Sequence, residues 1–137
     1  LVPILFSRHP VARFASLHRY LVKKHRQTYP EVPEDIDAFA AQLREGQEAY
    51  LGRIISLQPQ VTFLPKEVTP ELGRFENLEA DFKRIFGKFG IHAELPRLNA
   101  SDRSRTGTGG SSGLSPASRR FLLERYREDM EVFGYDG

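Results

Sequence analysis

The stretch LVPILFSRHPVARFAS, residues 1–16, decides how the rest of the chain is interpreted. Its apolar start, from Leu1 to Phe6, predicts a buried strand. Pro10 fits the first turn of a helix, because its missing N–H has no partner there and its fixed φ suits the helix. The sequence therefore predicts a strand that turns sharply into a helix, with Arg8 at the turn.

This turn carries the groups that an anion needs. A helix start offers unpaired N–H groups and the positive end of the helix dipole. Arg8 adds a forked, permanently charged donor, and Ser16 adds a hydroxyl two turns into the helix. Two other roles stay open: Arg8 could pair with a carboxylate, and Ser16 could bond its own helix backbone.

Arg13 lies three residues before Ser16, so the two can share one face of the helix. Direct contact with the phosphate is one expectation for Arg13. A structural ion pair, with Glu76 as a partner, is the commoner fate of such an arginine. Both remain open at the level of sequence.

Composition limits the class of protein. A length of 137 residues predicts one domain, and 39% hydrophobic with 28% charged residues is typical of a soluble globular protein. The net charge of +2 is too small to indicate nucleic acid, and we expect no such partner. The absence of cysteine excludes disulfides and a cysteine nucleophile, and four scattered histidines predict no metal site. No stretch approaches the roughly 18 to 20 apolar residues that span a bilayer.

The periodicity of the chain predicts an α/β fold with few strands and about four helices. Helices are expected over residues 10–26, over 34–54 with a break near Gly46 or Gly52, over 79–89 ending at Gly90, and from Ser115 to Phe133. Strands are expected over 73–78 and, as a short piece, over 61–64. Residues 102–113 are rich in Gly, Ser and Thr and predict a flexible loop.

Four segments together resemble one family. RHPVARFAS, residues 8–16, resembles the 3′-phosphate-binding motif of sulfotransferases that use 3′-phosphoadenosine 5′-phosphosulfate (PAPS), in particular the branch that modifies carbohydrates. GRFENLEADFKRIF (73–86), LPRLN (95–99) and YREDMEVFGY (126–135) resemble three further segments of that branch in the same order.

The resemblance implies a cofactor, PAPS, and a reaction, transfer of a sulfonate to a hydroxyl of a carbohydrate-type acceptor. It implies that Arg8 and Ser16 hold the 3′-phosphate. Arg103 and Arg105 lie where the family closes over the adenosine half, so they are expected either to clamp the cofactor or to be solvated loop charges. The implied fold is the C-terminal part of a P-loop-like sulfotransferase domain, with parallel strands flanked by helices.

One part of the family pattern does not occur in the sequence. The strand, Lys- and Thr-containing loop and helix that grip the 5′-phosphosulfate are missing, so we expect a single domain, 1–137, that is incomplete at its N-terminus. The family's catalytic base usually precedes the 3′-phosphate motif as well, and no catalytic residue is assigned. His9 is expected as the residue before Pro10 and His18 as a residue half in the core, rather than as acid or base.

Two other functions remain open. The chain could be a non-catalytic or truncated module that binds adenosine 3′,5′-bisphosphate or an anionic glycan. It could also be a helical interaction domain whose basic residues 23–26 contact phosphates weakly. We expect a cytoplasmic location, with the Golgi lumen as the alternative if the chain is part of a longer membrane-anchored protein.

Overall fold

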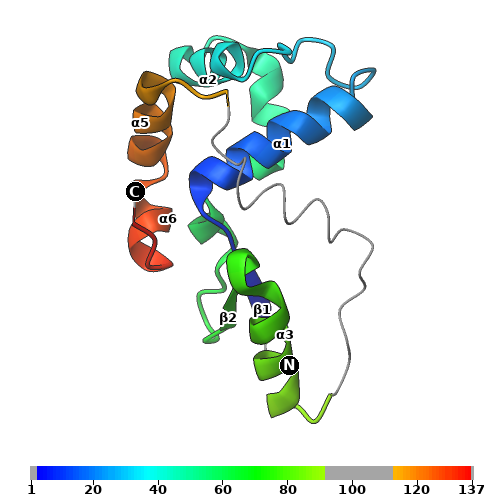
Figure 1. Ribbon diagram of the computed structural model, residues 1–137, viewed down its shortest axis with the longest axis vertical. Coiled ribbons are helices and arrows are strands. Elements are labelled where there is room, and N and C mark those ends of the chain that lie inside the picture. Colours follow the sequence, from blue (N-terminus) through cyan, green and yellow to red (C-terminus); the bar gives the residue numbers. More distant parts are fainter. Residues whose placement is uncertain (1–2, 92–112, 137) are drawn as a thin grey trace.

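A computed structural model describes residues 3–91 and 113–136 of the protein. Within these residues the fold is mixed α/β, with five α-helices and a two-stranded parallel sheet. The helices α1, α2 and α5 pack together at one end, and the sheet with α3 lies at the other (Figure 1). Most of the predicted loop at 102–113, together with Arg103, Arg105 and the LPRLN segment, lies outside the described residues.

The predicted turn from strand to helix is present. Strand β1 spans Ile4–Ser7 and helix α1 spans Pro10–Lys24, with Pro10 in the first turn as expected. His9 caps the helix, because its side chain accepts a hydrogen bond from the Val11 N–H at 3.2 Å. Lys23 and Lys24 lie in the last turn, where positive charge is favourable.

The helix predicted over 34–54 is interrupted at Gly46, one of the two glycines where a break was expected, and α-helical geometry does not resume after it. Helix α2 spans Ile36–Glu45 and ends at Gly46, whose φ of 69° is a conformation that glycine adopts without strain. Three short 3-10 helices follow: η1 (Ala49–Arg53), η2 (Ile55–Leu57) and η3 (Gln60–Phe63). The strand predicted over 61–64 is therefore wrong, because η3 occupies this segment.

The second strand pairs in parallel with the first. Strand β2 spans Glu71–Arg74 and pairs with β1 in register from Ile4–Glu71 to Ser7–Arg74. It ends earlier than predicted, and the 3-10 helix η4 (Phe75–Asn77) leads directly into α3, which spans Leu78–Lys88. The predicted stop is confirmed: Gly90 has a φ of 73°, and the Ile91 N–H bonds back to the Phe86 carbonyl at 2.9 Å.

The predicted C-terminal helix is divided. Helix α5 spans Pro116–Arg125 and begins at the cap Ser115, as predicted, while α6 spans Arg127–Val132. The chain leaves helical geometry at Tyr126, whose φ and ψ are −105° and 29°. The hydroxyl of Tyr126 donates to the Leu57 carbonyl at 2.5 Å, so this point also ties the C-terminal helices to the segment of 3-10 helices.

The core is built where α1, α2 and α5 meet. Phe39, Leu122 and Val11 are almost completely buried, and the Phe14 and Phe39 rings stack with centroids 5.1 Å apart. Ile85 of α3 is fully buried against the sheet. No helix of the described residues is both long and apolar enough to span a membrane.

Candidate functional site

The carboxyl ends of β1 and β2 lie at one edge of the sheet, because the two strands are parallel. Arg8 directly follows β1, and Phe75 directly follows β2. Ligands of parallel α/β sheets bind at this edge. The predicted arginine therefore lies at the edge where a ligand is expected.

The Arg8 guanidinium is half-buried and has no anionic partner at hydrogen-bond distance among the described residues. Its central carbon lies 4.2 Å from the centre of the Phe75 ring, so the charge rests on an aromatic face. Burial lowers the pKa of Arg8, the nearby Glu76 opposes this shift, and the positive charge of Arg19 adds to it. A cation withdrawn from water without a bound anion is costly, and a phosphate here would offset that cost.

Ser16 lies in α1, half-buried, and its hydroxyl has no hydrogen-bond partner within residues 3–91 and 113–136. Arg19 lies one turn further along the same helix, and residues three apart are neighbours on a helix surface. Arg19 was not predicted as a site residue, although its spacing from Ser16 was available in the sequence. The charge of Arg19 acts on Arg8, so the two arginines lie near each other. We call Arg8, Ser16 and Arg19 the Arg8 cluster.

Arg13 is engaged elsewhere. Its guanidinium donates to the Gln58 carbonyl at 2.8 Å, and burial lowers its pKa. The ion pair of Arg13 with Glu76, considered from the sequence, is not formed. The charges of Tyr126 and Asp129 act on Arg13, which places it near α6.

The start of α1 differs from the expectation of free N–H groups. Glu76 accepts the His9 N–H at 2.8 Å, and the His9 ring accepts the Val11 N–H. The side chains of Glu76 and His9 therefore bind two backbone N–H groups that were expected to be free for an anion. The side chains of the Arg8 cluster are donors that stay available.

A second group of polar side chains joins the strand ends to the C-terminus. The Tyr135 hydroxyl donates to Glu76 at 2.7 Å and lies 3.1 Å from the Ser7 hydroxyl, and burial raises the pKa of Tyr135. Arg74 donates to the Phe133 and Gly134 carbonyls at 2.8 and 2.9 Å. Glu76, Arg74 and Tyr135 belong to two of the segments that resemble the family, but the contact between these segments was not predicted.

Gln60 and Asp129 are the other residues that the sequence did not single out at this site. The side-chain amide of Gln60 bonds both the N–H and the carbonyl of Arg8, each at 2.8 Å. Asp129 is completely buried and accepts the Gln60 N–H at 2.8 Å. Asp129 was visible as part of YREDM, whereas nothing in the local sequence distinguishes Gln60.

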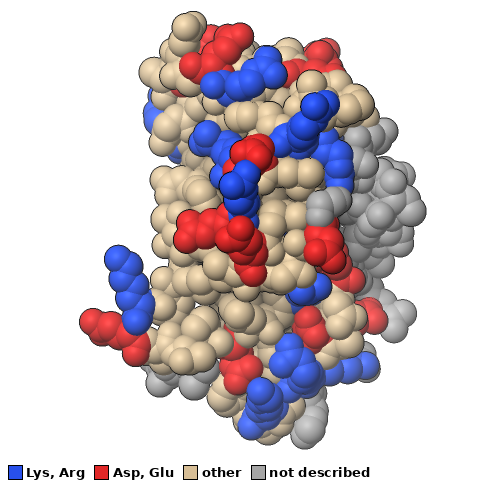
Figure 2. Space-filling view, turned by 90° about the vertical axis from the view of Figure 1, so that its left-hand side faces the viewer, with Lys and Arg blue, Asp and Glu red and all other residues tan. Residues whose placement is uncertain are grey.

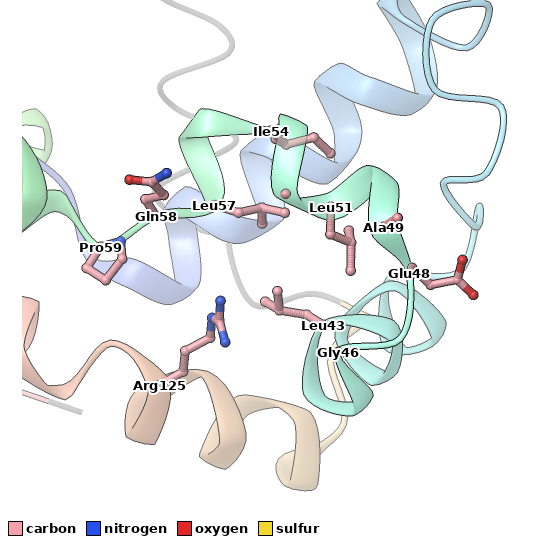
Figure 3. Close-up of a pocket in the computed structure, with 11 residues that line it drawn as sticks. Leu43, Gly46, Glu48, Ala49, Leu51, Ile54, Leu57, Gln58, Pro59 and Arg125 are labelled. Atoms are coloured by element: carbon pink, nitrogen blue, oxygen red, sulfur yellow. The ribbon is translucent and has the colours of Figure 1, made fainter.

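A pocket of about 430 Å³ lies between the end of α2, the helices η1 and η2, and α5 (Figure 3). Its walls are mostly apolar, and Arg125 extends from α5 toward Leu43 and Leu57. Among the predicted site residues that the structure describes, Arg8, Arg13 and Ser16 do not line it. His18, the other histidine considered from the sequence, is buried and bonds the Pro33 carbonyl at 2.8 Å, which agrees with a structural role.

A model of the sulfotransferase family matches residues 2–136. The chain therefore belongs to the sulfotransferase family, and its function is that of a transferase of sulfonate groups. No curated protein and no solved structure matches the chain.

Proposed function

We propose that this chain binds PAPS through its 3′-phosphate and takes part in transfer of the sulfonate to a hydroxyl of a carbohydrate-type acceptor. Arg8 and Ser16 are the proposed phosphate ligands, and Arg19 is a third donor close to them. Arg13 is a weaker candidate, because its guanidinium already bonds a carbonyl. Arg103 and Arg105 are proposed as clamps on the adenosine half, on the sequence alone.

The observation that carries this proposal is the state of the Arg8 side chain. It lies at the carboxyl edge of a parallel sheet, half-buried, with no hydrogen bond or salt bridge to a described residue. The Ser16 hydroxyl also has no hydrogen-bond partner among the described residues. Membership of the sulfotransferase family supports an anionic sulfonate donor as the ligand.

In the proposed reaction, the S–O bond to the cofactor's phosphate breaks as a new S–O bond forms to the acceptor oxygen. The acceptor hydroxyl loses its proton to a base that we do not assign. The Arg8 cluster would act by positioning, because a donor held in line by its 3′-phosphate reacts with little further loss of freedom. We propose that the described residues form the C-terminal part of a P-loop-like fold, and that other residues grip the 5′-phosphosulfate.

Titration with adenosine 3′,5′-bisphosphate tests the proposal. Hydrogen bonds to charged groups contribute about 1.5–3 kcal/mol, so Arg8→Ala is expected to weaken binding by about 10- to 100-fold. Ser16→Ala removes one hydroxyl donor and is expected to weaken it by about fivefold. Isothermal titration calorimetry on the folded variants measures both effects.

Lys24→Ala is the matched control, because Lys24 is exposed in the last turn of the same helix. It separates the proposal from the alternative of a basic helix end that binds any polyanion. That alternative would be favoured if Lys24→Ala and Arg8→Ala lost affinity equally and if salt abolished the binding. Figure 2 shows acidic and basic side chains interleaved on one face of the molecule, so that face carries no broad patch of one charge.

A further inference from the structure

The backbone of Arg8 is held by a side chain 52 residues further along the chain. The Arg8 N–H donates to Oε1 of Gln60, and Nε2 of Gln60 donates to the Arg8 carbonyl, both at 2.8 Å. One amide group thus binds both the N–H and the carbonyl of Arg8, as a neighbouring strand would. Gln60 is 6% exposed, so water competes little for these bonds.

Asp129 lies beside the Gln60 amide and supports the orientation that binds Arg8. Its carboxylate is completely buried and accepts the backbone N–H groups of Gln60 and Val61 at 2.8 and 2.9 Å. It also lies 3.4 Å from Nε2 of Gln60. Because a carboxylate only accepts hydrogen bonds, it favours the amide orientation in which Nε2 faces Asp129 and Oε1 faces the Arg8 N–H.

The direction of the Arg8 side chain depends on the backbone that carries it. Arg8 lies between the last residue of β1 and the cap of α1, so its backbone belongs to neither regular element. The bonds from Gln60 replace the missing ladder and helix bonds at this residue. From this backbone the Arg8 guanidinium extends over the Phe75 ring, 4.2 Å from its centre.

We propose that Gln60 is a positioning residue, which Asp129 orients and which holds the Arg8 backbone so that the guanidinium meets the 3′-phosphate of the nucleotide. This inference rests on the proposed function. It assigns a role to a residue that contacts no ligand itself. Substitution of Gln60 should therefore weaken nucleotide binding only when Arg8 is present.

A double-mutant cycle tests this dependence. Gln60→Met keeps the length of the side chain and removes its hydrogen bonds. We expect it to weaken binding of adenosine 3′,5′-bisphosphate by about tenfold in the wild-type background, and by about twofold or less in the Arg8→Ala background. Hydrogen exchange of the Arg8 amide, measured by NMR, should become faster in Gln60→Met.

Tyr126→Phe is the matched control for general loosening, because it removes a bond to the Leu57 carbonyl, three residues before Gln60, and leaves Gln60 intact. Tyr126→Phe should not change the affinity for adenosine 3′,5′-bisphosphate. If Gln60→Met does not fold, Gln60→Asn replaces it, since a side chain one methylene shorter cannot reach both Arg8 groups.

The outcomes separate the two proposals. If the wild type binds the nucleotide, Arg8→Ala weakens this binding and Gln60→Met leaves it unchanged, only the positioning role is overturned. Equal losses for Gln60→Met in both backgrounds, or an equal loss in Tyr126→Phe, also overturn it. Absence of binding by the wild type shows that both the proposed function and this inference are wrong.

Discussion

At the scale of single residues, the polar side chains near the strand ends differ in whether they have hydrogen-bond partners. Glu76, Asp129 and Gln60 each hold backbone N–H groups of distant segments, and their distances to those groups are 2.8 Å. Arg8 and Ser16 differ from them, since within the described parts of the chain neither side chain has a hydrogen-bond partner. This contrast is the reason for placing the ligand at Arg8 and Ser16.

We expect His9 to make the stability of the fold depend on pH. Burial is the largest cause that lowers its pKa, and the nearby Arg119 adds to it, while a hydrogen bond with the Asp136 backbone and the charge of Glu76 oppose it. The folded state therefore binds a proton less readily than the unfolded chain, whose histidines titrate near ~6.5. The His9 contribution to stability is complete above that pH and is lost as the pH falls toward the folded pKa.

We predict that the urea midpoint of the wild type falls more between pH 7.5 and pH 5 than that of His9→Asn. Asparagine can cap a helix but does not titrate, so it keeps the bond to Val11 at both pH values. The other three histidines are common to both proteins, and their effects cancel in the difference. Identical losses in the two proteins would show that His9 does not titrate with folding.

Part of this site could be predicted from the sequence. Arg8, Ser16 and the helix start at Pro10 lie within nine residues, and local rules apply to such a stretch. The role of Gln60 could not be predicted, because its partners Arg8 and Asp129 lie 52 and 69 residues away and are brought to it only by packing. Glu76 was considered as a partner of Arg13, and only the fold shows that His9 and Tyr135 take its oxygens.

At the scale of elements, the ends of helices were predicted better than their interiors. Gly46, Gly90 and Gly134 all have positive φ at the end of a helix, and glycine signals such ends in the sequence. The break at Tyr126 has no glycine or proline to signal it. At this break the Tyr126 hydroxyl bonds the Leu57 carbonyl at the end of η2, so the break depends on a tertiary contact.

The segment over 61–64 was misassigned for a similar reason. Val61 and Phe63 alternate with polar residues as in a strand, yet Phe63 is exposed and Gln60 is the buried residue of this segment. Asp129 binds the first N–H groups of η3, at Gln60 and Val61. A distant carboxylate therefore fixes a helical turn where the local pattern favoured a strand.

The two-stranded sheet depends on a close approach at Gly73. A Cβ atom added to Gly73 would lie 2.5 Å from the ring of Phe6, its partner across the sheet, and 3.2 Å from Ile85. We predict that Gly73→Ala destabilises the protein by about 1–3 kcal/mol, because the ring has to move. Chemical denaturation measures this change.

Gly87→Ala is the matched control for that substitution. Gly87 lies inside α3, and an added Cβ would meet no atom within 4 Å. Alanine is favoured over glycine in a helix, so Gly87→Ala should stabilise the protein by up to about 1 kcal/mol. A Gly73→Ala protein as stable as the wild type would contradict the close contact with Phe6.

At the scale of the whole molecule, three distant segments converge on the edge of the sheet. The strand end at 7–9, the turn at 74–76 and the C-terminal residues 133–136 share hydrogen bonds through Glu76, Tyr135 and Arg74. The segments that resembled the family in sequence are thus largely the segments that meet in space.

The most direct test compares two ligands that differ by one phosphate. Calorimetric titrations of the wild type and Arg8→Ala with adenosine 3′,5′-bisphosphate and with adenosine 5′-monophosphate form a cycle between the arginine and the 3′-phosphate. We predict that Arg8→Ala weakens binding of the bisphosphate by about 10- to 100-fold and binding of the monophosphate by about twofold or less. An equal loss for both ligands, or no preference of the wild type for the bisphosphate, would contradict the assignment of Arg8 to the 3′-phosphate.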